Sequence, residues 1–158
     1  MKEMRRKDRE IVDAERIEQI VAGTQIMRVG FYDEGEIYIV PVNFGYVKNG
    51  EHYTFYFHGA KAGRKYELSK SAPKIGFELD RNYALIEGDS ACSFSAEYQS
   101  VIGTGTLRLV EDRDEKISGL NAVMKQTTGR ENWEYQEKVL DMVAVFRVDV
   151  EKMSCKAH

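Results

Sequence analysis

The sequence predicts a mainly β protein of the α+β class, an antiparallel barrel of about six strands with a few short helices. Three observations support this prediction. Segments rich in β-branched and aromatic residues recur along the chain, separated by turn residues. Apolar residues at helical spacing are confined to short stretches between these segments. No Gly-rich dinucleotide fingerprint follows a strand, which argues against a Rossmann fold.

The first half of the chain begins with a charged lead-in and one helix. Asp13 is a typical N-cap, Ile17 and Ile20 follow at helical spacing, and Gly23 is expected to end the helix. The predicted strands cover 26–32, 37–47 and 53–58.

Two turn or breaker signals refine these strands. Pro41 cannot donate to a sheet ladder, so it predicts an edge position or a bulge within 37–47. Asn49 and Gly50 both tolerate the positive φ of a type I′ turn, so they predict a hairpin before the strand at 53–58.

The second half of the chain continues the mixture of strands and helices. A helix is predicted over about 63–71, followed by a strand over 74–80, a loop over 81–92 and a long β segment over 93–110. A helix capped by Asp112 or Asp114 and closed by Gly129 comes next. It is followed by a shorter helix that Asn132 can cap and by a last strand over 143–150. Within the long β segment, Gly103 and Gly105 predict a bend or bulge.

Composition excludes several classes of protein. The 158 residues favour a single domain, 1–158, and 42% hydrophobic with 31% charged residues is ordinary for a globular protein. A net charge of −3 argues against a general nucleic-acid binder. The two cysteines, Cys92 and Cys155, suit a reducing compartment, and no Cys/His spacing predicts a metal site. We see no signal peptide and no membrane span, so we expect a cytoplasmic protein.

The main candidate site is the stretch from 53 to 68, where an aromatic strand ends at His58. A glycine-bracketed turn carrying Lys61 follows, and then a helix whose first residues include Arg64 and Lys65. Free N–H groups and the dipole at a helix start favour an anion, and the basic side chains would hold it. The alternative is a solvated basic helix start. His58 is a candidate to orient or protonate a ligand, although a packed histidine is the alternative.

Four short motifs occur in order and at plausible spacing: Met-Arg-Arg-Lys-Asp-Arg-Glu at 4–10, Val-Pro-Val-Asn-Phe-Gly-Tyr at 40–46, Phe-His-Gly-Ala-Lys-Ala-Gly-Arg-Lys at 57–65, and Tyr-Gln-Ser-Val-Ile-Gly at 98–103. Together with Trp133 they resemble the FMN-binding split-barrel family related to pyridoxamine phosphate oxidase. Within that family the chain is most similar to the Nim-type nitroimidazole-resistance proteins. The resemblance covers nearly the whole chain.

The resemblance implies FMN as the cofactor. The residues that would bind it are Pro41, Val42, Asn43, Phe57, His58, Lys61, Arg64, Lys65 and Ser100. The three basic residues of the turn would hold the phosphate, and the residues of strand 37–47 would lie against the ring. The resemblance also implies a homodimer with the flavin at the subunit interface.

As an activity, the resemblance implies an FMN-dependent oxidoreductase that reduces a small planar acceptor such as a nitro-heterocycle, with NAD(P)H as a candidate electron donor and His58 as the catalytic residue. The alternatives are a flavin- or haem-binding module for sensing, storage or electron transfer, and a structural dimer without cofactor. Thr104 and Thr106 depart from the family pattern, which leaves the substrate open. The Arg-rich C-terminal motif of true pyridoxamine phosphate oxidases is lacking, so we do not expect that activity.

Overall fold

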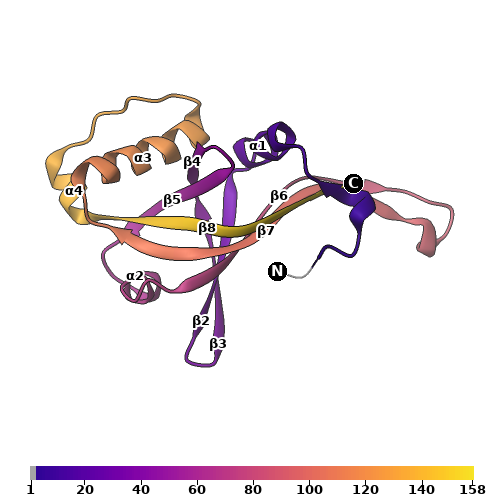
Figure 1. The fold of residues 1–158 in the computed structure, drawn as a ribbon, viewed down its shortest axis with the longest axis horizontal. Helices are drawn as coiled ribbons and strands as arrows, with labels where there is room; N and C mark the ends of the chain where they lie inside the picture. The colour runs from indigo at the N-terminus through magenta and orange to yellow at the C-terminus, as the bar shows by residue number, and fades with distance from the viewer. Residues whose placement is uncertain (1–2) are drawn as a thin grey trace.

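A computed structural model describes residues 3–158 and shows a single antiparallel sheet of eight strands in the order β3-β2-β6-β7-β8-β5-β4, with β1 paired to β8 (Figure 1). The strands are β1 (Glu10–Ile11), β2 (Ile26–Asp33), β3 (Glu36–Asn43), β4 (Gly45–Asn49), β5 (His52–Ala60), β6 (Lys74–Ile86), β7 (Ser95–Val110) and β8 (Val143–Ala157). The helices are α1 (Ala14–Ala22), α2 (Arg64–Ser69), α3 (Arg113–Thr128) and α4 (Glu137–Met142), with 3₁₀ turns at Lys7–Arg9 and Ala91–Ser93.

The predicted fold class is confirmed, but the strand count exceeds the expected six or so. The apolar run 37–47 is divided at Phe44 into β3, which pairs with β2, and β4, which pairs with β5. Pro41 lies in β3, which ends the sheet order, so its predicted edge position is confirmed.

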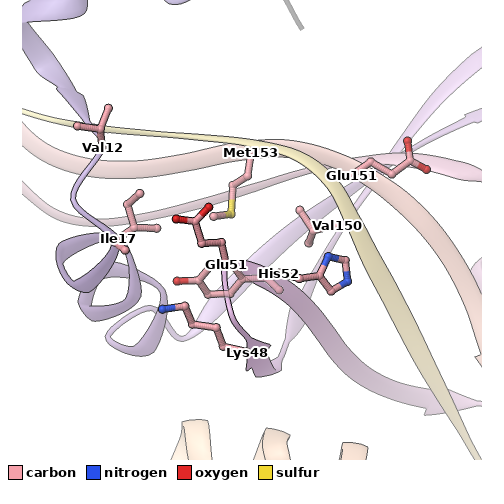
Figure 2. Close-up of a pocket in the computed structure, with 10 residues that line it drawn as sticks. Val12, Ile17, Lys48, Glu51, His52, Val150, Glu151 and Met153 are labelled. Atoms are coloured by element: carbon pink, nitrogen blue, oxygen red, sulfur yellow. The ribbon is translucent and has the colours of Figure 1, made fainter.

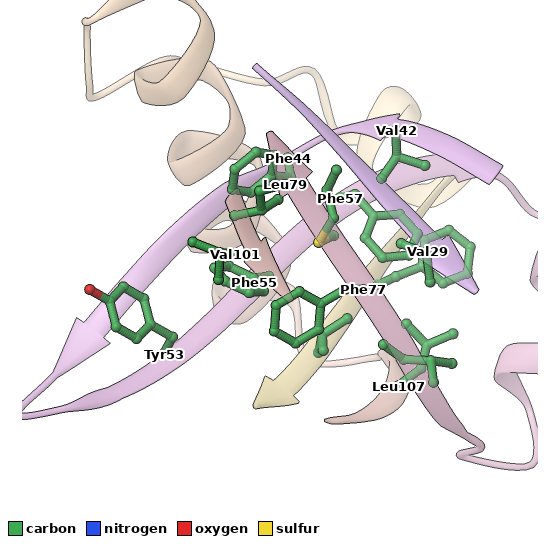
Figure 3. Packing of buried hydrophobic residues seen from close by; sticks show 14 of the residues in the cluster. Val29, Val42, Phe44, Tyr53, Phe55, Phe57, Phe77, Leu79, Val101 and Leu107 are labelled. Atoms are coloured by element: carbon green, nitrogen blue, oxygen red, sulfur yellow. The ribbon is translucent and has the colours of Figure 1, made fainter. Parts of the chain in front are cut away.

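The curled sheet encloses an aromatic core (Figure 3). Phe55 meets Phe77 edge to face with centroids 5.1 Å apart, and Phe57 stacks on Phe146 at 4.9 Å. Each such pair contributes about 0.5–1.5 kcal/mol beyond the burial of its area. Tyr53 lies at one end of the cluster, and its hydroxyl points away from the other labelled side chains. β5 therefore runs through the core and carries its far end, His58–Ala60, to the barrel end where α2 sits.

A second, smaller core lies on the outer face of β5 and β8, beneath α3 and α4 (Figure 1). Tyr56 and Val145 face Leu120 of α3 and Leu140 of α4 there. β4 also touches α3 directly, because a Cβ at Gly45 would lie 2.1 Å from the backbone carbonyl carbon of Ala122. α3 and α4 thus cover one half of the sheet and leave the outer face of β2 and β3 exposed.

Several local predictions are confirmed. The Asp13 and Asp112 side chains accept hydrogen bonds from the first turns of α1 and α3. Gly129 ends α3 in the left-handed conformation, with φ of 75°. The β7–β8 register shifts between Thr104 and Gly105, which is the predicted bulge.

Two segments differ in part from their predictions. The first half of the loop expected over 81–92 is instead the continuation of β6 to Ile86. A bulge between Arg81 and Ala84, with Asn82 at φ of 58°, lets the ladder with β7 resume. The shorter helix expected around Trp133, with Val139 and Leu140 on its apolar side, does form as α4, but it begins at Glu137 rather than after Asn132. Asn132 has φ of 62°, and the Trp133 N–H groups bond to Asn121 and Arg130 in an irregular segment before α4.

The hairpin after β4 also differs in detail. Asn49 pairs with His52, so the two turn residues are Gly50 and Glu51, and only Gly50 has positive φ. Within residues 3–158, none of the helices combines the length and the apolar character that crossing a membrane requires.

Candidate functional site: the basic turn after β5

The basic turn lies between the end of β5 and the start of α2. Gly63, with φ of 95°, turns the chain into α2, and Tyr66 and Leu68 pack against the aromatic core. α2 has only six residues, so side chains rather than the helix dipole must provide most of any anion binding. The three basic residues of the turn point in different directions.

Lys65 lies over the aromatic core. Its Nζ is 5.5 Å from the ring centroids of both Phe57 and Phe146, and a Cβ built on Gly59 would lie 3.2 Å from it. Burial lowers the pKa of Lys65 below its ordinary value. Within residues 3–158, no carboxylate forms an ion pair with this ammonium group. A half-buried cation held by ring faces is therefore available to an incoming anion.

Arg64 is already paired with carboxylates. Its guanidinium bonds to Asp33 at 2.7 Å and Glu36 at 2.9 Å, and it lies 4.6 Å above the ring centroid of Tyr38. Hydrogen bonds that Arg64 donates to the two carboxylates raise the pKa of Arg64 above its usual range. Arg64 therefore ties α2 to the β2–β3 turn, and an anion would have to compete with two carboxylates for it.

Lys61 points to the other side of the turn. Its Nζ donates a hydrogen bond to the carbonyl oxygen of Asp141 at 2.6 Å, at the end of α4. The structure therefore does not bring Lys61, Arg64 and Lys65 together on one point.

His58 lies in β5 opposite Val145 of β8, with its side chain exposed at the outer face. Desolvation by the surrounding chain lowers the pKa of His58, and the positive charge of Lys65 lowers it further. A neutral imidazole carries one N–H donor and one acceptor nitrogen, so near pH 7 it can both orient a ligand and exchange a proton.

The residues predicted to contact the flavin ring lie partly on the exposed face and partly on the buried face of β3 and β5. Pro41 and Asn43 are exposed on the outer face of β3, whereas Val42 is only 8% exposed and Phe57 is fully buried. The Asn43 amide donates to the carbonyl oxygen of Gln25 at 3.3 Å. Pro41 and Asn43 can therefore touch a ligand, while Val42 and Phe57 support them from the core. Ser100 is half-buried in β7, opposite Asp80 and Lys156.

Sequence reasoning missed an apolar platform on the outer face of β2, β3 and β6, which the ion pairs of Arg28 with Glu78 and Asp80 border. Gly30 lies directly between Ile39 and Gly76 across the three strands, and Ile37 and Ile39 are 70% and 62% exposed. A Cβ at Gly30 or Gly76 would meet nothing closer than 3.8 Å, and neither glycine has positive φ. The chain itself does not require these glycines, and strand glycines often mark a close approach of a ligand or another backbone. Each occurs alone within an apolar strand pattern, which was the only signal in the sequence.

A cavity of about 310 Å³ lies at the opposite end of β5. Figure 2 shows Ile17 of α1, Lys48 and Glu51 of the β4–β5 hairpin, and Met153 of β8 around it. None of the nine predicted site residues lines this cavity.

These features define a class of protein: an antiparallel split barrel with a basic turn at one barrel end and an uncovered apolar sheet face beside it. The family is shown by comparison, because the model of the pyridoxamine 5'-phosphate oxidase family matches residues 13–157. The chain belongs to this family. A comparison with curated proteins found no match to this chain.

Solved structures agree with this assignment. A proposed 5-nitroimidazole antibiotic resistance protein from Bacteroides thetaiotaomicron is 30% identical, with a TM-score of 0.79 over 94% of this chain and 86% of that one. The flavocytochrome Anf3 from Azotobacter vinelandii (23% identical, TM-score 0.79, 99% of this chain and 72% of that one) has the same fold. An FAD- and haem-binding protein from Mycobacterium smegmatis also has this fold (16% identical, TM-score 0.82, 94% of this chain and 73% of that one). The resemblance to Nim-type proteins is therefore confirmed.

Proposed function

We propose that the protein binds FMN at the basic turn and acts as an oxidoreductase on a small planar acceptor such as a nitro-heterocycle. The observation that carries this proposal is the half-buried Lys65 ammonium, which lies beside Gly59 with no carboxylate partner among the described residues. A phosphate is the group that would best compensate such a charge.

The other residues at the turn fit the rest of a flavin. Pro41 and Asn43 offer an apolar surface and an amide on the outer face of β3, where a flat ring could lie. Arg64 would add a second phosphate contact if it released Asp33 and Glu36. We leave Lys61 out of the proposed site, because its ammonium group points toward α4.

A bound flavin would supply the redox chemistry. The protein's part is then to position the acceptor. The neutral His58 imidazole can donate a hydrogen bond to an electron-rich acceptor oxygen, or pass a proton to it as charge develops. NAD(P)H is our candidate electron donor.

We also propose that two copies associate through the exposed platform of β2 and β3. Ile39 is large, exposed and paired with Gly30, and the exposed Ile37 lies further along the same face of β3, so a second chain could approach the sheet closely there. Size-exclusion chromatography with light scattering would show a dimer, and Ile39→Asp should shift it toward monomer. A protein that is monomeric at all concentrations would exclude this part of the proposal.

An absorption spectrum tests the cofactor. The purified protein, loaded with FMN and desalted, should keep a flavin band that bleaches with NADH and returns when a nitro-heterocycle is added. Lys65→Gln should weaken FMN retention by about tenfold or more, since it removes a charge-assisted contact. Lys70→Gln is the matched control, because Lys70 lies at the C-terminal end of α2 and pairs with Glu67. Equal flavin content in both variants would remove Lys65 from the site, and a Soret band would favour haem instead.

A further inference from the structure

Two lysines line a second cavity that the proposed flavin site does not use. The cavity has a volume of about 300 Å³ and lies between the turn after β5, the end of β7 and the starts of α3 and β8. Its lining includes Lys61 and Lys116, apolar walls from Leu109, Val110, Val143 and Ala144, and Tyr66 and Glu111.

The two ammonium groups are held close together by α4. Lys61 donates to the carbonyl oxygen of Asp141 at 2.6 Å, and Lys116 donates to the preceding carbonyl, that of Leu140, at 2.5 Å. Lys116 is only 8% exposed. Burial lowers the pKa of Lys116, and the positive charge of Lys61 lowers it further.

The Asp141 carboxylate acts on Lys116 without forming an ion pair with it, so this arrangement leaves the positive charge of the two lysines only partly compensated. Lysines are almost never buried unless they are paired with an anion. In residues 3–158 neither Lys61 nor Lys116 forms an ion pair with a carboxylate, and Glu111 lines the cavity without reaching either within ion-pair distance. The Leu140 carbonyl satisfies one of the three N–H donors of Lys116. The carbonyls that end α4 favour cations, but a six-residue helix provides little of the compensation that two lysines need.

We infer that this cavity binds a small oxyanion, a carboxylate or a phosphate, between Lys61 and Lys116. The apolar walls leave room for a short hydrocarbon part beside the anionic group. Lys61 then belongs to this cavity and Lys65 to the flavin, although only three residues separate them in the sequence.

A titration followed by ¹H–¹⁵N NMR tests this inference on the full chain. The probes are sodium butyrate, inorganic phosphate and the neutral isostere butyramide, at constant ionic strength, and the signals are the backbone amides of Glu111, Val143 and Ala144. Butyrate or phosphate should produce saturable shifts, and which of the two binds more tightly identifies the source of the oxyanion. Butyramide should produce none.

Three variants separate binding from simple capping of α4. Lys61→Gln and Lys116→Gln should each weaken the affinity for the oxyanion by about tenfold or more. Lys138→Gln removes an exposed lysine of α4 that does not line the cavity, and should leave the affinity unchanged. If Lys116→Gln does not fold, the affinity of Lys61→Gln alone tests the inference, because Lys61 is exposed and its replacement should not disturb folding.

Several outcomes would overturn the inference. These are the absence of saturable shifts with both anions, equal shifts with butyramide, or unchanged affinity in Lys61→Gln. A Lys61→Gln variant that loses its flavin instead would return Lys61 to the flavin phosphate. The titration does not depend on flavin, so a protein that fails to bind FMN leaves this test intact.

Discussion

The guanidinium of Arg64 lies 4.6 Å above the ring of Tyr38, so the first residue of α2 is stacked on the middle of β3. Asp33 and Glu36, on either side of the β2–β3 turn, hold the same guanidinium from its edge. The turn that carries the candidate phosphate ligand is thereby tied to the strand that carries the candidate ring contacts.

The double variant Asp33→Asn with Glu36→Gln should release Arg64 for an anion. We expect FMN affinity to rise several-fold, because a planar guanidinium forms strong paired hydrogen bonds with phosphate once its carboxylates are neutral. Fluorescence quenching of FMN measures the affinity, with Glu34→Gln, which leaves Arg64 paired, as the control. A lower affinity would mean that the two carboxylates position Arg64 rather than compete for it.

Truncating Phe146 should lower the free energy of unfolding more than truncating most other residues. It is fully buried and stacked on Phe57, so Phe146→Ala should destabilise the fold by about 3–5 kcal/mol through lost burial and a residual cavity. Urea denaturation gives the value. Phe94→Ala, at a side chain that is 45% exposed, should change stability far less. Similar losses in the two variants would contradict the described core.

His58 should titrate below the ordinary histidine value of about 6.5. Because its pKa is lowered in the folded state, the unfolded chain binds the proton more readily, and stability falls as pH drops from about 6.5 toward the folded pKa. An NMR titration of the His58 ring gives the midpoint. Lys65→Gln should move that midpoint upward, since it removes the second cause of the shift. An unchanged midpoint would show that Lys65 does not act on the imidazole.

Replacing Gly76 tests whether the platform serves association or flavin binding rather than the stability of the fold. Gly76→Ala should leave the stability of the isolated chain nearly unchanged, because its Cβ would meet nothing closer than 3.8 Å, yet it should weaken association or flavin binding. Gly103→Ala should instead destabilise the fold, because that Cβ would lie 2.3 Å from the Lys152 carbonyl oxygen. Thermal unfolding and light scattering distinguish the two effects. If Gly76→Ala alters neither association nor flavin binding, the platform has no such role.

Local signals in the sequence predicted much of the fold. The caps at Asp13 and Asp112 and the left-handed end at Gly129 depend on a few neighbouring residues, so they could be recognised directly. The division of 37–47 at Phe44 depends on which strands β3 and β4 pair with. The uninterrupted apolar pattern of this segment contains no information about those partners. The extension of β6 past Arg81 likewise depends on its partner strand β7.

The candidate site shows the same limit. The sequence displays three positive charges between residues 61 and 65, but their directions are set by the turn at Gly63 and by distant partners. Asp33 lies 31 positions from Arg64, and Asp141 lies 80 positions from Lys61. The platform at Gly30 and Gly76 was hidden for a related reason, because two isolated glycines become one surface only when β2 and β6 pair.

The near contact of Gly45 with Ala122 has a consequence for how the molecule opens. At this point no side chain fits between α3 and β4, so a small separation of the two would leave a void that no side chain fills. Amide hydrogens of β4 and α3 should therefore exchange with solvent in one cooperative opening, at a common free energy, while those of the short α2 exchange earlier through local fraying.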